Sequence, residues 1–297
     1  MNVFKTIPEL NEYFGIDSKH PLIDIQQFAD ASTASQMKRE PAIYEFYKIL
    51  FIRNFNGFMQ QGGTKFDGKN GVLYFITPGQ MYTCTSTVPW DGYQILIHPD
   101  IFKNYLTAKN IDAYSFFSYG VNESLLLTVD EEATVDFLME ASWNELNNKN
   151  DNFSIPNILS YISILLNTSE RFYLRQFSTR NMACNQLTTD FFALLKTYYD
   201  DAITPVKQPS VAFFSEKLAI TPNYLSDMIR HHTGKSALTF IHEYVIEEAK
   251  ILLKTSDKSI SEISMMLGFE YSSYFSRLFK KKTAVSPSQF RKSVKSV

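Results

Sequence analysis

The first hundred residues alternate between short apolar runs and groups of turn-forming residues. Apolar, β-branched and aromatic residues fill 44–52 (YEFYKILFI), 71–76 (GVLYFI) and 93–98 (YQILIH). Asn-Gly, Gly-Gly and Asp-Gly pairs lie between the first two runs, and Thr77-Pro78-Gly79 follows the second. Short strands separated by such turns predict a small β sandwich or barrel.

After Pro99 the pattern becomes helical. Asp130 is the expected N-cap of a helix with acidic residues in its first turn, and the apolar positions of this helix are Ala133, Phe137, Leu138, Ala141 and Leu146. A second helix is predicted from Ser154 toward Phe177. Two helices appended to a β domain either complete its core or form a dimer surface, and the pattern leaves both open. The polar stretch 178–189 has no clear period, and we interpret it as a linker.

The remaining segment contains one small unit twice. Segments starting at Ser210 and at Ser259 align with an offset of 49, which becomes 50 after one extra residue in the turn. A repeat of this kind indicates an internal duplication. The matched positions are Val211 with Ile260, Phe214 with Ile263, Leu218 with Leu267, Tyr224 with Tyr274, Leu225 with Phe275, Ser226 with Ser276, Ile229 with Phe279, Thr233 with Thr283 and Phe240 with Phe290.

Each copy is predicted to form two short helices joined by a tight turn. In the first copy Thr221-Pro222 is a helix start and Gly234 a helix end. In the second, Ser259-x-x-Glu262 is a capping box and Gly268 provides the turn. This arrangement is typical of the helix-turn-helix, whose second helix enters the major groove of DNA. A long apolar-striped helix over 236–254 is predicted to connect the copies rigidly.

Charge is distributed unevenly along the chain. The net charge is −2, but residues 186–297 carry 15 basic against 11 acidic residues, and 271–297 carry 7 basic residues and no acidic one. A local basic face can bind phosphate whatever the total charge. The sequence has no apolar run long enough for a membrane span, no signal peptide and only two distant cysteines, so we expect a reduced, cytoplasmic protein.

Residues 186–297 resemble the DNA-binding domain of the AraC/XylS family of transcription regulators. The first copy matches through Leu218, Thr221-Pro222, Tyr224-Leu225-Ser226 and Thr233-Gly234-Lys235-Ser236. The second departs from the pattern at Ser264, where alanine is usual, and at Ala284, where glycine is usual, so its helix end is expected to be strained or differently capped. The second copy and the helix before it match through Ala249, Leu252-Leu253, Ile260, Ile263, Leu267-Gly268-Phe269, Ser273, Phe275, Arg277, Phe279-Lys280-Lys281, Ser286-Pro287-Ser288 and Phe290-Arg291.

The resemblance implies an α+β protein of two domains. Residues 1–180 would form a cupin-like β-barrel with appended helices, serving sensing or dimerisation, and 181–297 an all-α domain with two helix-turn-helix units. Tyr82 stands where such sensors often have a histidine, so metal or sugar binding of that style is not expected. The implied function is a DNA-binding regulator and activator, with double-stranded DNA, RNA polymerase, a small-molecule effector and a second copy of the chain as partners.

The helical period divides the two recognition helices into a core face and an outward face. Leu225, Met228 and Ile229, and in the second copy Phe275, Leu278 and Phe279, are predicted to be core. Arg277 is the best candidate for reading a guanine edge, and Asn223 for reading adenine. The residues expected to meet DNA are Asn223, Ser226, Asp227, Arg230, Tyr271, Ser272, Ser273, Ser276, Arg277, Lys280, Lys281 and Arg291.

Some of these assignments keep an alternative. Asp227 either accepts from a cytosine amino group or forms an intramolecular salt bridge. Lys280, Lys281, Lys282 and Arg291 are expected to meet phosphates and to set register. Tyr224 and Tyr274 are interpreted as half-buried supports rather than base contacts.

The sequence lacks the side chains that two possible enzyme activities would need. A cupin oxygenase needs clustered histidines, yet the N-terminal half contains only His20 and His98. An alkyl-repair methyltransferase needs an activated cysteine, and neither Cys84 nor Cys184 has suitable neighbours. The histidines at 231, 232 and 242 lack metal-ligand spacing and are expected on a helix surface. We therefore predict no enzyme, cofactor or metal.

The role of the N-terminal half stays open between two hypotheses. It either senses a ligand or only dimerises or binds another protein. Its aromatic residues could line a ligand cavity or fill the barrel, and filling is the stronger expectation. These residues are Phe46, Phe51, Phe58, Phe66, Tyr74, Tyr82, Trp90 and Tyr93.

Overall fold

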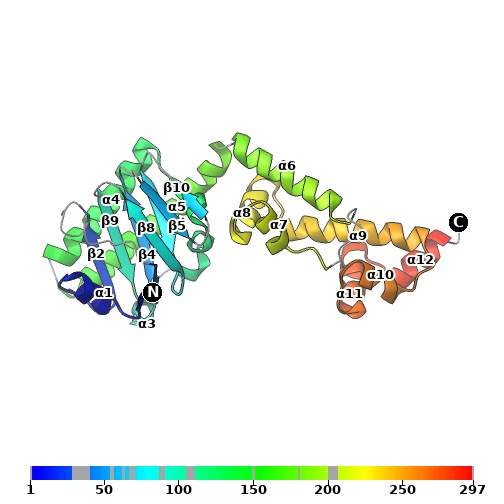
Figure 1. Cartoon of the computed structure of the whole chain (residues 1–297), viewed down its shortest axis with the longest axis horizontal. Coiled ribbons are helices and arrows are strands. Elements are labelled where there is room, and N and C mark those ends of the chain that lie inside the picture. The colour runs from blue at the N-terminus through cyan, green and yellow to red at the C-terminus, as the bar shows by residue number, and fades with distance from the viewer. Residues whose placement is uncertain are drawn as a thin grey trace. The chain divides into compact units, whose positions relative to one another are not determined.

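The computed structural model places the chain in two compact units, residues 1–179 and 180–297. Figure 1 shows the elements in chain order. Within the described part, every helix is too short or too polar to cross a lipid bilayer. The structure describes all residues except 1, 29–40, 54–56, 62–63, 67–70, 87–90, 105–110, 149–150, 180, 200–206 and 296–297.

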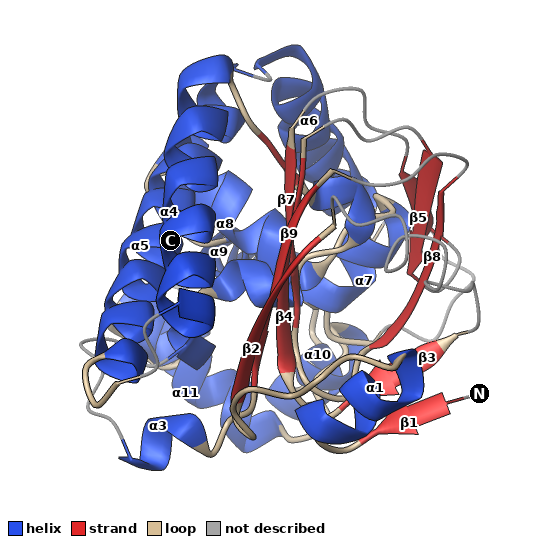
Figure 2. Ribbon diagram, turned by 90° about the vertical axis from the view of Figure 1, so that its left-hand side faces the viewer, coloured by secondary structure: helices blue, strands red, loops and turns tan. Residues whose placement is uncertain are grey.

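Unit 1 is built on two five-stranded sheets that face one another (Figure 2). The first has the order β1 (Asn2–Phe4), β3 (Ala42–Tyr44), β8 (Met81–Ser86), β5 (Gly57–Gln61) and β6 (Thr64–Phe66). The second has the order β10 (Leu125–Leu126), β7 (Val72–Ile76), β4 (Tyr47–Ile52), β9 (Gly92–Ile97) and β2 (Ile23–Gln27). The strands predicted at 71–76 and 93–98 are thus confirmed, and 44–52 divides into the end of β3 and β4. The described strands form two separate sheets and not the closed barrel that was expected.

The second sheet is buried on both faces. Leu50 and Tyr74 belong to the core between the two sheets, together with Phe4 and Ile7 of β1 and the short helix α1 (Ile7–Phe14). Helices α4 (Val129–Asn148) and α5 (Ser154–Thr179) cover the opposite face (Figure 2). A strand covered on both sides is mostly apolar, and β4, β7 and β9 are apolar apart from the buried Lys48 of β4 and Gln94 of β9. The intervening short helices are α3 (Ile101–Asn104) and three 3₁₀ turns at 111–113, 115–118 and 121–123.

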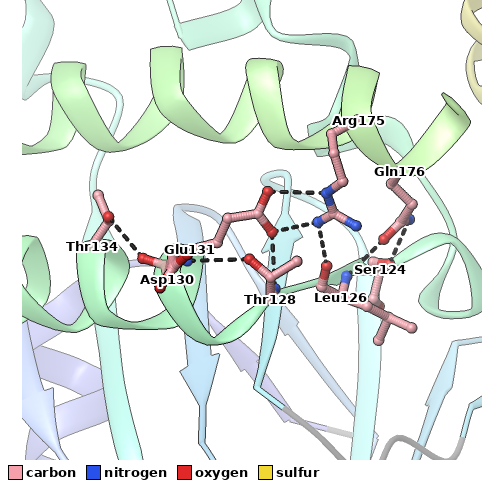
Figure 3. Close-up of polar contacts among 8 residues, drawn as sticks. All are labelled: Ser124, Leu126, Thr128, Asp130, Glu131, Thr134, Arg175 and Gln176. Atoms are coloured by element: carbon pink, nitrogen blue, oxygen red, sulfur yellow. Dashed lines mark hydrogen bonds and ion pairs between the residues drawn. The ribbon is translucent and has the colours of Figure 1, made fainter. Parts of the chain in front are cut away.

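Polar contacts tie the start of α4 to α5 (Figure 3). Thr128 caps α4 by accepting from the backbone of Glu131, whose carboxylate in turn accepts from the backbone of Thr128. The same carboxylate accepts from Arg175 of α5, which also donates to the carbonyl of Leu126 at 2.7 Å. The N-cap is therefore Thr128, and the predicted cap Asp130 lies in the first turn, because the Thr128 hydroxyl is the group that meets a free backbone N–H.

The buried face of α4 agrees with the prediction at Leu138 and Leu146 and differs from it elsewhere. Val135 and Met139 are buried, whereas Ala133 is exposed and Phe137 is 66% exposed. Of the aromatic residues discussed above, Phe46, Phe51, Tyr74 and Tyr93 are buried, so these four fill the core of unit 1. The side chains of Phe58, Phe66, Tyr82, Cys84, Trp90 and Cys184 lie outside the described residues.

Unit 2 is helical. It comprises α6 (Asn181–Thr197), α7 (Val211–Lys217), α8 (Pro222–Thr233), α9 (Ala237–Thr255), α10 (Ile260–Met266), α11 (Ser272–Thr283) and α12 (Pro287–Lys295). Figure 1 shows α7 and α8 beside the start of α9, and α10, α11 and α12 along its remaining length. The predicted linker 178–189 is wrong, since α5 continues to Thr179 and α6 begins at Asn181.

Candidate nucleic-acid interface

The first helix-turn-helix consists of α7, a tight turn and α8. The Ser210 hydroxyl caps α7, and the Thr221 hydroxyl caps α8 by accepting from the backbone of Tyr224. Pro222 occupies the first position of α8, as predicted. Ala219 takes the left-handed conformation in the turn, with φ of 55°, and Gly234 does so at the end of α8. These local choices fix the angle between the two helices.

The second helix-turn-helix repeats this construction with α10 and α11. Ser259 and Glu262 form the predicted capping box, and the hydrogen bonds from Ser259 lower the pKa of Glu262. Gly268 takes the left-handed turn position with φ of 81°. A Cβ at this position would lie 2.2 Å from the carbonyl carbon of Lys207, so the packing leaves space for glycine alone. Ala284 ends α11 in the left-handed conformation, so the expected strain at this alanine is present.

Helix α9 joins the two helix-turn-helix units through its buried face. Ile241 and Val245 are fully buried in its first half, and Ala249 and Leu253 in its second. Both recognition helices, α8 and α11, pack against it. A single continuous helix with one buried stripe therefore carries both units, as the sequence predicts.

The outward face of α8 carries some side chains that are exposed and others that form contacts within the helix. Asn223 and Arg230 are exposed, while Leu225, Met228 and Ile229 are buried as predicted. The Ser226 hydroxyl donates to the carbonyl of Pro222 at 2.8 Å. Asp227 lies 3.8 Å from Arg230, which is the intramolecular ion pair that the sequence left as an alternative. Asn223 and Arg230 are accordingly the side chains of α8 best placed to reach a ligand.

The outward face of α11 is more basic. Phe275, Leu278 and Phe279 are buried as predicted, and Ser276 is half-buried. Tyr271, Ser272, Ser273, Arg277, Lys280 and Lys281 are exposed. This face presents three cations along one side of a short helix, which suits a polyanion.

Four side chains lie in surroundings that differ from those expected from the sequence. Tyr224 is buried, with 3% of its surface exposed, but its counterpart Tyr274 is 42% exposed. Arg291 on α12 is half-buried, and two of its guanidinium nitrogens are buried without a hydrogen-bond partner in the described part of the chain. His242, expected on a helix surface, is half-buried between α9 and α11, where burial and then Lys282 and Lys281 lower its pKa.

Residues 214–293 match a family described as "Helix-turn-helix domain". The arabinose operon regulatory protein of Escherichia coli (strain K12) is 37% identical over 81 residues, which are 27% of this chain and 28% of that protein. The C-terminal unit is an AraC-type DNA-binding domain. The 81-residue match to the arabinose regulator spans under a third of that protein's length.

Two further proteins are similar to this chain, one by sequence over most of its length and one by structure over its C-terminal part. The HTH-type transcriptional activator RhaS of Salmonella schwarzengrund (strain CVM19633) is 24% identical over 84% of this chain and 86% of that protein. The C-terminal domain of the response regulator yesN from Fusobacterium nucleatum subsp. nucleatum is a solved structure that is 30% identical, with a TM-score of 0.30, covering 33% of this chain and 95% of that one. These relatives are regulators by name. Among the described residues no three His, Cys, Asp or Glu side chains gather where they could hold a metal ion.

Proposed function

We propose that the chain is a sequence-specific transcription regulator that inserts α8 and α11 into successive major-groove segments of double-stranded DNA. The observation that carries the proposal is the pair of recognition helices mounted on the one helix α9, each with its apolar side buried and its polar side exposed. Arg277 and Asn223 are exposed on these faces and have the donors that base edges require. Lys280 and Lys281, which are exposed, would set the register through phosphates.

The experiment is a selection of duplexes from a random-sequence pool with the full chain, followed by quantitative binding. We expect enrichment of a site with two blocks of preferred bases about one helical turn apart, roughly 34 Å, because each recognition helix reads one major-groove segment. A pool that shows no enrichment, or a single block of three to four base pairs, contradicts the proposal.

We further propose that the protein is an activator and that unit 1 regulates its activity by dimerising and by binding an effector. Five polar residues support an effector site: Asn11 and Asp24 are hydrogen-bonded at 2.8 Å, Gln26 donates to both, and Gln94 donates to Gln26. Lys48 lies over the Tyr44 ring, on the same side of the sheet as Leu50 and Leu96, between the two sheets. Gln94 is 3% exposed, and its side-chain amide oxygen Oε1 has no hydrogen-bond partner among the described residues.

A buried acceptor without a partner costs about 1–3 kcal/mol, which a hydroxyl-bearing effector would recover. A metabolite that stabilises the full chain thermally, but not its Gln94→Leu variant, would support sensing over the alternative of dimerisation alone. Contact with RNA polymerase belongs to the same proposal, since activation requires it. The exposed Phe137 of α4 is the feature that favours α4 and α5 as the dimer surface.

A further inference from the structure

A groove lies between the first two turns of α9 and the side of α11. It has a volume of about 540 Å³. The recognition helix borders it along most of its length, so a molecule bound to the outward face of α11 would also pass over the groove. The residues that matter here are Leu238, Thr239 and His242 of α9, and Arg277, Lys281 and Lys282 of α11.

The charge of this groove is positive. Arg277 and Lys281 are exposed and have no acidic partner in the described part of the chain. Lys282 lies 3.6 Å from Glu243, but that carboxylate also binds Lys235 at 3.1 Å. One acidic side chain is therefore shared between two lysines, and the groove keeps an excess of positive charge that favours an anion.

The place of the groove in the fold indicates which anion. Thr239 and His242 lie in the first two turns of α9, the helix against which α8 packs, and α11 forms the other wall of the groove. When α8 lies in one major-groove segment and α11 in the next, a sugar–phosphate strand of the DNA runs between the two helices. A phosphate there would meet the ammonium groups of Lys281 and Lys282 and the imidazole of His242 together.

We propose that the groove seats a backbone phosphate of the DNA strand that crosses between the two recognition helices, with His242 of α9 as a direct contact beside Lys281. The inference rests on the proposed DNA-binding function and adds α9 to the contact surface. The helix between the two units is then part of the interface as well as a spacer.

A consequence is that DNA binding takes up a proton. In the free protein, burial and then Lys282 and Lys281 lower the pKa of His242, which favours the neutral imidazole. Tyr274 and Arg277 also line the groove, and Glu243 is the neighbouring carboxylate. A bound phosphate is an added negative charge that raises the imidazole pKa. Affinity therefore rises as the pH falls from the raised pKa in the complex toward the lowered pKa in the free protein, by up to about tenfold per pH unit for one proton.

The test measures binding of the full chain to its selected duplex between pH 8 and pH 5.5 at constant ionic strength. The variants are His242→Gln, which keeps a polar donor but does not titrate, and His20→Gln as the matched control. His20 lies in unit 1, and burial lowers its pKa as well. We expect the rise in affinity at low pH in the wild type and in His20→Gln, and its loss in His242→Gln.

A second measurement locates the phosphate. Duplexes with single methylphosphonate linkages remove one phosphate charge at a time, and we expect one position between the two base blocks that weakens the wild type at least threefold more than His242→Gln. Lys281→Gln, at an exposed site, should show the same loss of sensitivity and keeps the test open if His242→Gln does not fold. Equal pH profiles and equal methylphosphonate profiles in the wild type and the variants overturn the inference. A wild type that binds no duplex contradicts the proposed function instead.

Discussion

Ala219 and Ala284 both take the left-handed backbone conformation, where glycine is favoured. The repeat places Ala219 opposite Gly268 and Gly234 opposite Ala284, so each copy has glycine at one of its two left-handed positions and alanine at the other. The left-handed conformation destabilises an L-residue by roughly 1–2 kcal/mol. A glycine at the same position avoids this strain but loses more conformational entropy on folding, which offsets part of the gain. The two copies therefore contain equivalent strain at different places.

Replacing Ala284 with glycine should stabilise unit 2. We expect the free energy of unfolding to rise by about 1 kcal/mol, because the helix end is relieved and no contact is lost. Urea unfolding of the full chain, followed by circular dichroism at 222 nm, measures the change. Gly234→Ala is the matched control at the equivalent position, where a Cβ would meet nothing within 4 Å, and should cost a similar amount. An unchanged or lowered stability of Ala284→Gly would show that the backbone there is not strained.

Arg277 and Lys281 lie one turn apart on α11 and are predicted to play different parts. Arg277→Ala should cost about 1–3 kcal/mol of binding to the selected duplex and relax the preference at one base position, since a bidentate base contact is lost. Lys281→Ala should weaken selected and scrambled duplexes alike and reduce the salt slope by about one, since a phosphate contact is lost. Binding to both duplexes across a salt series separates the two. If Arg277→Ala weakens both duplexes equally, Arg277 is not a base-reading residue.

At the scale of elements, local signals were sufficient where capping chemistry determines the structure. Thr221, Gly234, Ser259 and Gly268 all have the predicted roles, because hydroxyl caps and positive φ values depend on a few neighbouring atoms. Helix faces were less predictable when the decision came from distant residues. In α4 the adjacent Phe137 and Leu138 are about 100° apart, and the packing of α4 against α5 and the second sheet determines which of the two is buried.

The start of α6 and the two tyrosines show a second limit of the sequence pattern. Apolar periodicity reports which face of a helix is buried and not whether a segment is helical, so a helix with a polar start is taken for a linker. Tyr224 and Tyr274 are equivalent in the repeat but differ in burial, because the alignment contains no information about what each copy packs against. Exposure was predictable from the helical period for Asn223, Arg230, Arg277, Lys280 and Lys281, whereas Ser226, Asp227, Ser276 and Arg291 are half-buried.

Phe137 gives the dimer hypothesis an element-level test. Sedimentation of the full chain should show a dimer, and Phe137→Ser should weaken its association more than tenfold, because burying a phenylalanine is worth about 1.5–3 kcal/mol. Phe153 is 71% exposed in the turn between α4 and α5, so Phe153→Ser is a matched control that should leave association unchanged. Dimers of unchanged strength in Phe137→Ser would place the interface elsewhere.

For the whole molecule, the connection through α9 would limit which DNA sites the proposed regulator can bind. A helix of 19 residues is roughly 28 Å long, which is close to one turn of DNA, and its buried stripe holds both recognition helices. Basic residues exceed acidic ones in 186–297, whereas the rest of the chain has a net negative charge. In the proposed function, attraction to DNA is therefore concentrated in the unit whose geometry would select the spacing.

This rigidity predicts how spacing between the two base blocks affects affinity. Inserting five base pairs between the blocks turns the second block to the opposite side of the duplex, and affinity should fall to that of a scrambled duplex. Inserting ten base pairs restores the side but moves the block about 34 Å further, beyond the reach of α11 while α8 is bound. A flexible connection would recover affinity at ten base pairs, whereas a continuous α9 would not. Five base pairs inserted outside both blocks serve as the control and should have no effect. Recovery at ten base pairs would mean that the two recognition helices bind independently.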